Sequence, residues 1–430
     1  MKLPFSDLIA FQRDQLNFFT SRGHEATEPL LPLAMGVGNV FLVTDAELVR
    51  PILKADESVI DKGRLIYKLR EIIGESSMVL SGEEHRARRG AIHAQLSKGI
   101  TSTYVTEISA VIRQLCAQLT QREAFDAHEA TATLAVRIIA TILFGHGVLS
   151  PADESALIHA LHLAEDDLAA QIFKIVPDLP WVRQRKKRKL ADANRTMALV
   201  VDKTRANAKR HSLISALEKL NLSDKAMHEE ILLNMLAGHH TSGSAAAWLL
   251  YFLARYPDIA EKIAEEARLI SDEAGEIDGS QLAKATTTLA FVKETLRLYP
   301  SAYWLSRETK RPIELGGRKL KPGSSLLISP WQLQRDPRYW QDPEKFDLSR
   351  THSGAAYIPF GAGPRVCVGM AFALLELQLF VLEIASSFDV QLLSPEPVNP
   401  PIPVITIIPP PMRMRLRPKM AHGKSQRKAA

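Results

Sequence analysis

A ten-residue segment near the C-terminus, Phe360 to Gly369 (FGAGPRVCVG), constrains the fold more than any other feature of this chain. It places Cys367, one of two cysteines in 430 residues, among three glycines and next to an arginine. Glycines let a backbone turn tightly and approach a large flat ligand closely. Such a loop can direct backbone N–H groups at a sulfur and hold it as the thiolate, the form that binds metal. The segment therefore predicts a metal-binding thiolate; the alternative is a buried cysteine in a glycine-rich loop.

The fixed positions of this segment, Phe-Gly-x-Gly-x-Arg-x-Cys-x-Gly, resemble the haem-binding loop of the cytochrome P-450 monooxygenases. The resemblance runs from about residue 35 to residue 417. It implies the P-450 fold, mainly α with minor β, in which one haem b lies between two helices. Cys367 would be the axial ligand of the iron, and Phe360 and Gly369 would contact the haem. An axial thiolate pushes electron density onto haem iron and favours cleavage of an O–O bond.

The hydrophobic periodicity of the chain independently favours a mainly helical fold. Val40 to Val43 predicts a strand of a small sheet, and turn residues alternate with β-branched runs from Pro300 onward. Apolar residues recur at helical spacing over 105–120, 128–145, 152–173, 226–255, 257–273, 289–298 and 371–388, and a basic helix is expected over about 183–209.

Length and composition favour a single large domain. The 430 residues could hold two or three domains, but no glycine/serine-rich or charged linker divides them. Hydrophobic residues make up 46% of the chain and charged residues 24%, as in a globular protein. We predict one haem domain over 1–417, followed by a basic, disordered tail over 418–430.

The cysteine content and the N-terminus bear on location. Two cysteines argue against a disulfide framework. Charged residues interrupt the first apolar stretch too early for a signal peptide, and the longest apolar run, Ala245 to Ala254, is too short to cross a membrane. We predict a cytoplasmic bacterial protein without a membrane span.

Two basic stretches raise the question of nucleic-acid binding. One is the C-terminal tail, and the other is the run 183–189 (RQRKKRK). Neither stretch is accompanied by aromatic residues or by a recognition motif. We interpret the tail as a solvated end and the run as the wet face of a helix start, and we expect no nucleic-acid partner.

The string AGHHTS over 237–242 lies in the middle of a predicted helix. A glycine and a hydroxyl residue can locally open the hydrogen-bond ladder of a helix. The string resembles the oxygen-side helix of the P-450 family, which implies that Ala237 and Thr241 face the haem and that Thr241 helps deliver protons. The family usually has Asp or Glu before the threonine, whereas this chain has His240. Histidine can also carry protons near neutral pH; the alternative is that His240 is a helix-surface residue.

Four cationic residues are candidates for the two haem propionates, which need hydrogen-bonded positive partners when buried. His85 and Arg89 lie one helical turn apart, Arg307 follows Pro300, and Arg365 precedes the cysteine by two residues. Each matches a propionate-binding position of the P-450 pattern. Arg86 and Arg88 would instead point outward on the cysteine side, where they could steer an acidic redox partner; the alternative is a plain solvated face.

A further pattern, Glu294-x-x-Arg297, places a carboxylate and a guanidinium on one face of a helix. It resembles the Glu-x-x-Arg of the family, which joins a later arginine in a buried triad. Arg350, in the segment WQDPEKFDLSR, is the candidate for the third member. The triad would be structural and would hold the cysteine loop while haem is loaded.

The resemblance implies a monooxygenase that hydroxylates or epoxidises a hydrophobic small molecule such as a terpenoid, a steroid or a fatty acid. Electrons would come from a ferredoxin or a flavodoxin and its reductase, because the chain has no flavin or iron–sulfur motif. Four alternatives remain: a peroxide-driven hydroxylase, a sterol-type demethylase suggested by AGHHTS, an O₂-independent haem-thiolate isomerase, and a non-enzymatic haem-binding protein.

The substrate pocket is expected from the segments that line it in the family. They correspond here to 66–78, 236–241, 302–304 and 404–405, which are chiefly apolar. Tyr67, Tyr303 and Trp304 would be the aromatic or hydrogen-bonding exceptions. An apolar pocket with few polar groups favours a lipid-like ligand.

Overall fold

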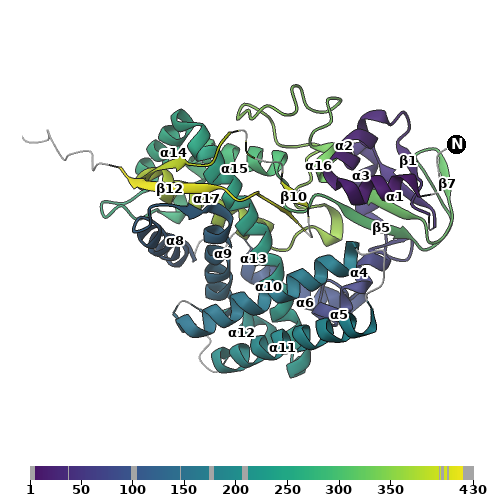
Figure 1. Ribbon diagram of the computed structural model, residues 1–430, viewed down its shortest axis with the longest axis horizontal. Coiled ribbons are helices and arrows are strands. Elements are labelled where there is room, and N and C mark those ends of the chain that lie inside the picture. Colours follow the sequence, from purple (N-terminus) through teal and green to yellow (C-terminus); the bar gives the residue numbers. More distant parts are fainter. Residues whose placement is uncertain are drawn as a thin grey trace, which may run out of the picture.

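Figure 1 shows the computed structural model, which describes residues 5–36, 38–97, 104–145, 147–173, 179–205, 212–396, 398, 401–403 and 406–419. Helices account for most of the described chain, and the five-stranded sheet lies at one side of them, on the right in Figure 1. The helices are α1 (Ser6–Arg13), α2 (Gln15–Glu25), α3 (Ala46–Lys54), α4 (Arg64–Lys68), α5 (Arg70–Ile73), α6 (Gly82–Leu96), α8 (Val105–Leu119), α9 (Ala127–Phe144), α10 (Pro151–Phe173), α11 (Pro180–Arg205), α12 (Leu213–Glu218), α13 (Asp224–Arg255), α14 (Pro257–Ile270), α15 (Thr286–Leu298), α16 (Pro330–Leu333) and α17 (Met370–Ser387).

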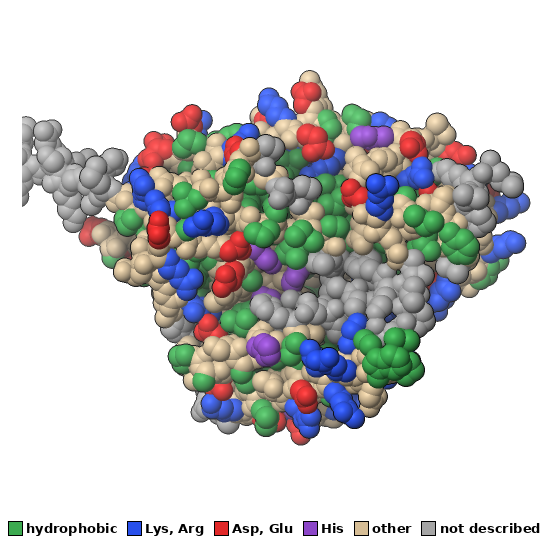
Figure 2. Space-filling model, in the orientation of Figure 1, with side chains coloured by type: hydrophobic (Ala, Val, Ile, Leu, Met, Phe, Trp, Pro, Cys, Tyr) green, Lys and Arg blue, Asp and Glu red, His purple; other side chains and the backbone are tan. Residues whose placement is uncertain are grey.

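The helices predicted from periodicity are confirmed. The helices α8, α9, α10, α11, α13, α14, α15 and α17 match the predicted ranges to within a few residues. The predicted basic helix is described as α11 up to Arg205, and residues 206–209 of its predicted range lie outside the described part of the chain. Figure 2 shows Lys and Arg side chains along the lower edge of the molecule, where Figure 1 places α11.

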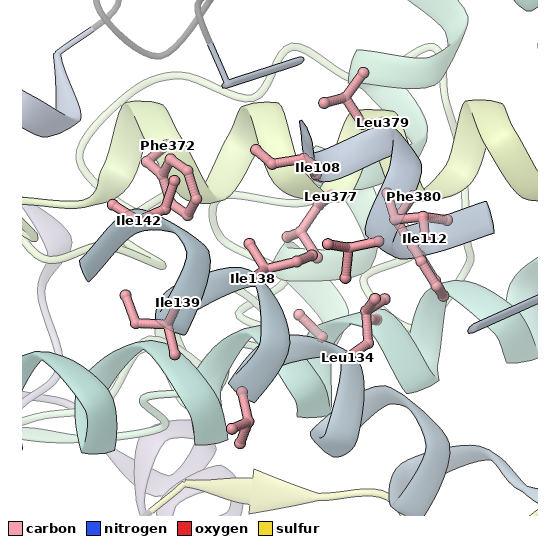
Figure 3. Packing of buried hydrophobic residues seen from close by; sticks show 14 of the residues in the cluster. Ile108, Ile112, Leu134, Ile138, Ile139, Ile142, Phe372, Leu377, Leu379 and Phe380 are labelled. Carbon is pink, nitrogen blue, oxygen red and sulfur yellow. The ribbon is translucent and has the colours of Figure 1, made fainter. Parts of the chain in front are cut away.

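The helix α13 is the axis of the helical part. Its N-terminus is capped by Ser223, whose Oγ accepts a hydrogen bond of 3.2 Å from the Ala226 N–H. From Ser242 to Leu253 every residue is buried, because this half of α13 is enclosed by neighbouring helices. Apolar side chains of α8, α9 and α17 pack together beside it, as Figure 3 shows for Ile108, Ile138 and Phe380, among others.

A glycine allows α9 to cross α13 at close range. A Cβ atom at Gly243 would lie 2.9 Å from the Cα of Ala132 on α9. The hydroxyl of Thr131 donates to the Gly243 carbonyl over 2.7 Å, so a hydrogen bond joins the two helices at the crossing. This contact fixes the part of α13 that carries the AGHHTS string.

The larger sheet has the strand order β1-β2-β8-β5-β3. The predicted strand 40–43 is confirmed as β2 (Val40–Val43), which pairs in parallel with β8 (Ser325–Ile328). The other members are β1 (Leu30–Leu33), β5 (Leu305–Thr309) and β3 (Ile60–Asp61). The strands β3 and β5 are neighbours, which brings Lys62 and Arg307 to the same end of the sheet.

The smaller sheets lie mainly near the C-terminus. The strands β4 (Phe125–Asp126) and β9 (Phe388–Leu392) flank β12 (Arg413–Pro418). The hairpins are β6 (Ile313–Leu315) with β7 (Arg318–Leu320), and β10 (Ile402–Pro403) with β11 (Ile407–Ile408). Lys419, inside the predicted tail, pairs with Glu261 at 2.7 Å; residues 420–430 lie outside the described residues.

Two helices have the length and apolar composition of a membrane span. They are α9 and α17, and 78% and 67% of the residues in these stretches are buried inside the protein. Interior helices of a folded domain have the same composition, so this resemblance to a span is weak evidence for one.

Candidate active site

A cavity of about 380 Å³ lies between α13, the cysteine loop and the edge of the larger sheet. Its lining is chiefly apolar, with side chains such as Ile66, Leu233 and Ala302. Of the site residues expected from the sequence, those that line the cavity are His85, Arg89, Ala237, Thr241, Arg307, Phe360, Arg365 and Cys367. Two expected site residues, His240 and Gly369, are not among the lining residues. Segments far apart in the sequence thus converge on one apolar space.

The cysteine loop is folded by its own backbone hydrogen bonds. The Cys367 N–H donates to the Phe360 carbonyl over 2.9 Å, and the Gly361 N–H donates to the Ile358 carbonyl over 3.0 Å. Gly363 has a φ of +73°, and a Cβ there would lie 2.2 Å from the carbonyl oxygen of Leu53 on α3. The loop can therefore lie this close to α3 only with glycine at position 363.

Cys367 presents its sulfur to the cavity. The residue is exposed, and it is one of the residues that line the cavity. Burial raises the pKa of the Cys367 thiol, while a hydrogen bond from the Gly369 backbone and the charge of Arg89 favour the thiolate. A cation at the sulfur would complete the stabilisation of the thiolate.

Positive charge gathers around the sheet side of the cavity. Lys62, which the sequence did not single out, lines it together with His85, Arg89, Arg307 and Arg365. Lys62 is buried, and its Nζ donates to the Leu80 carbonyl over 2.8 Å and to Ser81. No sequence motif marks Lys62; the pairing of β3 with β5 places it.

Carboxylates of the described residues balance only part of the positive charge around the cavity. Burial, then the charge of Arg365, lowers the pKa of His85 to about 4, so its ring is neutral near pH 7 and would serve a propionate as a hydrogen-bond donor; burial lowers the pKa of Lys62 to about 8. Burial also lowers the pKa of Arg307. Arg365 pairs with Glu57 at 2.6 Å, but within the described residues Arg89 and Arg307 form no ion pair with a carboxylate. An anionic ligand is the natural counter-charge for this group.

These residues fit a haem. The cavity offers an apolar slot for the ring, a sulfur for the iron, and cations for the acidic edge of the ring. Cys367 would hold the iron, whereas Lys62, His85, Arg89, Arg307 and Arg365 would hold the propionates. The structure thereby adds Lys62 to the set of cations predicted from the sequence.

The helix α13 forms the wall of the cavity that carries Thr241. The Thr241 hydroxyl lines the cavity and donates to the Ala237 carbonyl over 2.7 Å. The Ser301 hydroxyl donates to the Thr241 carbonyl over 2.9 Å. Because Thr241 Oγ1 uses its proton on the helix, its lone pairs can accept a hydrogen bond from a group in the cavity.

His240 points away from the cavity and contacts the C-terminal part of the chain. Its Nδ1 is hydrogen-bonded to the hydroxyl of Thr406, and its ring meets the His128 ring edge-on with centroids 6.1 Å apart. Since His240 is half-buried and hydrogen-bonded, it is not a simple exposed helix-surface residue. Its part in proton delivery stays a prediction.

A buried carboxyl that the sequence did not single out contacts α13 at Ser242, the residue after Thr241. Glu376 on α17 accepts a hydrogen bond of 2.9 Å from the hydroxyl of Ser242. Burial raises the pKa of Glu376 to about 8, and the Ser242 hydrogen bond only partly opposes this. The acid is therefore largely protonated near neutral pH. The only sign of it in the sequence was a glutamate within the otherwise apolar stretch that forms the first half of α17.

The predicted triad is confirmed. Glu294 forms ion pairs with Arg297 at 2.8 Å and with Arg350 at 3.2 Å. His352, a fourth member that was missed, contacts Glu294 at 2.8 Å. Arg297 also donates to the carbonyl of Gln334, whose side chain accepts the N–H of Ile358 at the start of the cysteine loop. The network thus braces the loop.

Four sequence predictions about this region were wrong. Tyr67 is not among the lining residues of the cavity, and its hydroxyl donates to Asp61 over 2.8 Å. Arg88 does not point outward: it is 4% exposed and pairs with the buried Glu230 at 3.1 Å. Tyr303 and Trp304 do not line the cavity, because they pack with Phe19 and Phe11 in an aromatic cluster at the N-terminal helices. Spacing alone could not show these partners. The pocket segment 404–405 lies outside the described residues.

Comparison with known proteins gives one consistent result. The family model described as Cytochrome P450 matches residues 5–416. The pentalenene oxygenase of Streptomyces avermitilis is 26% identical, with 94% of this chain and 93% of that protein covered. Cyclooctatin synthase of Streptomyces melanosporofaciens is also 26% identical, covering 96% and 93%. A second protein of that organism, cyclooctat-9-en-7-ol 5-monooxygenase, is 26% identical over 88% and 85%. Among solved structures, a cytochrome P450 from Thermus thermophilus superposes with a TM-score of 0.78 at 26% identity, over 95% of this chain and 97% of that one.

Proposed function

Because the chain belongs to the cytochrome P450 family and is a monooxygenase that binds haem through a cysteine thiolate, we propose that its substrate is a terpenoid-like hydrophobic molecule. The observation that carries the proposal is the apolar cavity between Thr241 and the Cys367 sulfur. Support also comes from relatives whose names specify oxidation of pentalenene and of a cyclic alkenol. The reaction would be hydroxylation or epoxidation.

Different residues of the chain would have different roles in such a reaction. When bound, haem with a thiolate ligand activates O₂ so that one oxygen atom enters the substrate. Ile66, Met78 and Leu233 would hold the hydrocarbon and exclude water from the cavity. Thr241 would accept a hydrogen bond from a water in the cavity. This contact would orient the second proton of that water toward the place where O₂ binds.

Protons and electrons would reach the site from different sides. We propose His240, in the place of the usual acid, as the group that passes protons toward Thr241. Electrons would come from a ferredoxin or a flavodoxin with its reductase. Arg86 is exposed on α6, the helix that also carries the cavity residue Arg89, and it would attract such an acidic partner. A cytoplasmic location would suit these partners.

The reduced carbon monoxide difference spectrum tests the site. We expect a band at about 450 nm, the position that gives the family its name, and we expect Cys367→Ser to abolish it. Cys116→Ser is the matched control, since Cys116 is buried on α8 away from the cavity and its variant should keep the band. Folded, haem-loaded wild-type protein without the band would refute the thiolate site.

A titration of the ferric protein tests the substrate class. Terpene alcohols, steroids and fatty acids of similar size are compared by the visible spectral change that follows displacement of water from the iron. Tighter binding of the terpene alcohols would support the proposal. Tighter binding of fatty acids or steroids would assign a different substrate class while leaving the monooxygenase activity intact.

A second function, a peroxide-driven hydroxylase, is favoured by one observation, the histidine at position 240. An enzyme that takes its oxygen from peroxide needs less proton delivery than one that uses O₂. Turnover with hydrogen peroxide but not with NAD(P)H, ferredoxin and reductase would establish this function.

A further inference from the structure

One wall of the cavity is formed by a short non-helical segment between α5 and α6, residues 74–81. Ser77 and Met78 of this segment line the cavity. Inside the segment, the N–H groups of Val79 and Leu80 donate to the Ser76 carbonyl over 2.9 and 3.0 Å, which forms a local turn, and its position against the rest of the protein is set by hydrogen bonds from outside. The hydrogen bonds that hold it come from two directions.

From one side, the segment is held by two consecutive carboxylates of α13. Glu230 accepts hydrogen bonds from both the N–H and the hydroxyl of Ser77, at 2.5 and 2.9 Å. Glu229 accepts the N–H of Glu75 at 3.1 Å. Its carboxylate packs so closely on Gly74, which has a φ of +59°, that a Cβ there would lie 2.1 Å from it. The segment is therefore both hydrogen-bonded to α13 and packed closely against it.

Arg88 completes this contact from α6. Its guanidinium donates to Glu230 over 3.1 Å and to the Glu75 carbonyl over 2.8 Å. Glu230 is fully buried and Arg88 is 4% exposed. Burying two charges is costly, and an apolar pair of the same volume is often as stable. Stability alone is thus a weak reason for this pair, whereas its hydrogen bonds to the 74–81 segment give it a specific role.

From the other side, the segment is held by two of the cations that face the propionate region. Arg365 donates to the carbonyls of Ser77, at 3.1 Å, and Leu80, at 2.6 Å, and Lys62 donates to Leu80 at 2.8 Å. Ser77 is consequently clamped between Glu230 and Arg365. Met78, the next residue, lines the cavity beside these anchors.

We propose that Glu230 and Arg88 are positioning residues that set the size and shape of the substrate cavity. They do so by fixing the Ser77–Met78 wall against α13, which lets the protein discriminate among hydrophobic ligands by their bulk. The inference rests on the proposed function in that haem occupies the cavity. It replaces the predicted role of Arg88 in steering a redox partner.

Two azole ligands of different size test this role in the haem-loaded ferric protein. Imidazole binds the iron and is too small to span the cavity, whereas 4-phenylimidazole adds a ring that needs the wall. In Glu230→Gln we expect the Kd of 4-phenylimidazole to rise about five- to ten-fold, because one charge-assisted anchor of Ser77 is weakened. The Kd of imidazole should change less than about two-fold.

Two further variants make the result interpretable. Glu84→Gln removes the exposed partner of Arg88 without touching the 74–81 segment, so both Kd values should stay as in the wild type. Ser77→Ala removes only the hydroxyl that donates to Glu230, so it answers the question even if Glu230→Gln does not fold. In Ser77→Ala we expect a smaller shift of the same sign for 4-phenylimidazole alone.

The outcome that overturns the inference is an equal change for both azoles, or no change for either, in Glu230→Gln and Ser77→Ala. A lower melting temperature with unchanged selectivity would show that the pair serves stability only. Failure of the proposed function is separate, because it would appear as a missing band near 450 nm in the wild type.

Discussion

Residue 240 is where the chemistry of this chain departs from the family pattern. A carboxylate there would have a charge at neutral pH, whereas histidine can both give and accept a proton near pH 7. The contact of His240 with Thr406 holds one ring nitrogen, and the ring also meets the His128 ring edge-on.

Replacing His240 tests proton delivery. In His240→Gln we expect the fraction of consumed O₂ that yields product to fall about ten-fold, since glutamine holds the hydrogen bond to Thr406 but cannot exchange a proton. Product formed with hydrogen peroxide should stay near the wild-type value. The measurement is product per NAD(P)H oxidised, with His159→Gln as the exposed control on α10. Equal losses with O₂ and with peroxide would point to a structural role.

Glu376 makes a prediction about stability. Its carboxyl pKa is raised from 4.5 to about 8 by burial. The folded protein then holds a proton that the unfolded chain releases, so the contribution of this group is intact below about pH 4.5. That contribution is lost as the pH rises to about 8, at up to roughly 1.4 kcal/mol per pH unit. Glu376→Gln should therefore gain stability over the wild type as the pH increases.

Urea unfolding of haem-loaded wild type and Glu376→Gln at pH 5 and pH 8 measures this difference. The control is Glu383→Gln on the same helix, which loses an ion pair with Arg113 at 2.9 Å and should be destabilised at both pH values. If the advantage of Glu376→Gln were the same at pH 5 and pH 8, the carboxyl would already be ionised in the folded protein.

At the scale of elements, the cysteine loop depends on its contact with α3. In Gly363→Ala the new Cβ would meet the Leu53 carbonyl, and the positive φ would add strain. We expect a loss of about 2–4 kcal/mol in stability and a lower haem content. Gly354→Ala is the control, because Gly354 has a φ of +95° but no atom within 4 Å of the added Cβ. Similar losses in both variants would assign the effect to φ alone.

The elements that were predicted share a strong local signal. The helix α13 was found because its apolar pattern extends over many turns, and β2 because four apolar residues stand together. The short helices α4 and α5 carry no such pattern, since one turn gives no periodicity to read. The partner of β2 is β8, which lies far along the chain. Their parallel pairing therefore could not be predicted from the residues of β2 alone.

The site residues differ in the same way. Some are recognisable from their neighbours in the sequence, and others only from partners that lie far away in the sequence. Cys367 and the pair Glu294 and Arg297 are defined by spacing within one segment, so the sequence was sufficient for them. The burial of Arg88 depends on Glu230, which comes from another helix. Lys62 reaches the cavity only because two strands pair. Residue type alone could not distinguish these buried charges from surface ones.

For the molecule as a whole, the cavity couples the cofactor to folding. Arg307 and Arg365 of the sheet and the loop, Arg89 of α6 and Lys62 converge on one space, where they repel each other unless an anion is present. A ligand that binds only the folded state adds its binding free energy to the stability of the whole protein. Arg365 also holds the carbonyls of the 74–81 segment, so the counter-charge stabilises both the haem site and the substrate wall.

Reconstitution with a modified haem tests this coupling. Iron protoporphyrin IX dimethyl ester has the same ring and iron as haem, but its two carboxylates are neutral. We expect the protein loaded with the ester to melt several degrees below the protein loaded with haem, because each charge-assisted hydrogen bond contributes about 1.5–3 kcal/mol. In Arg307→Met the gap between the two should narrow, since that variant lacks a propionate cation. Equal melting temperatures for haem and ester in the wild type would mean that these cations serve the protein alone.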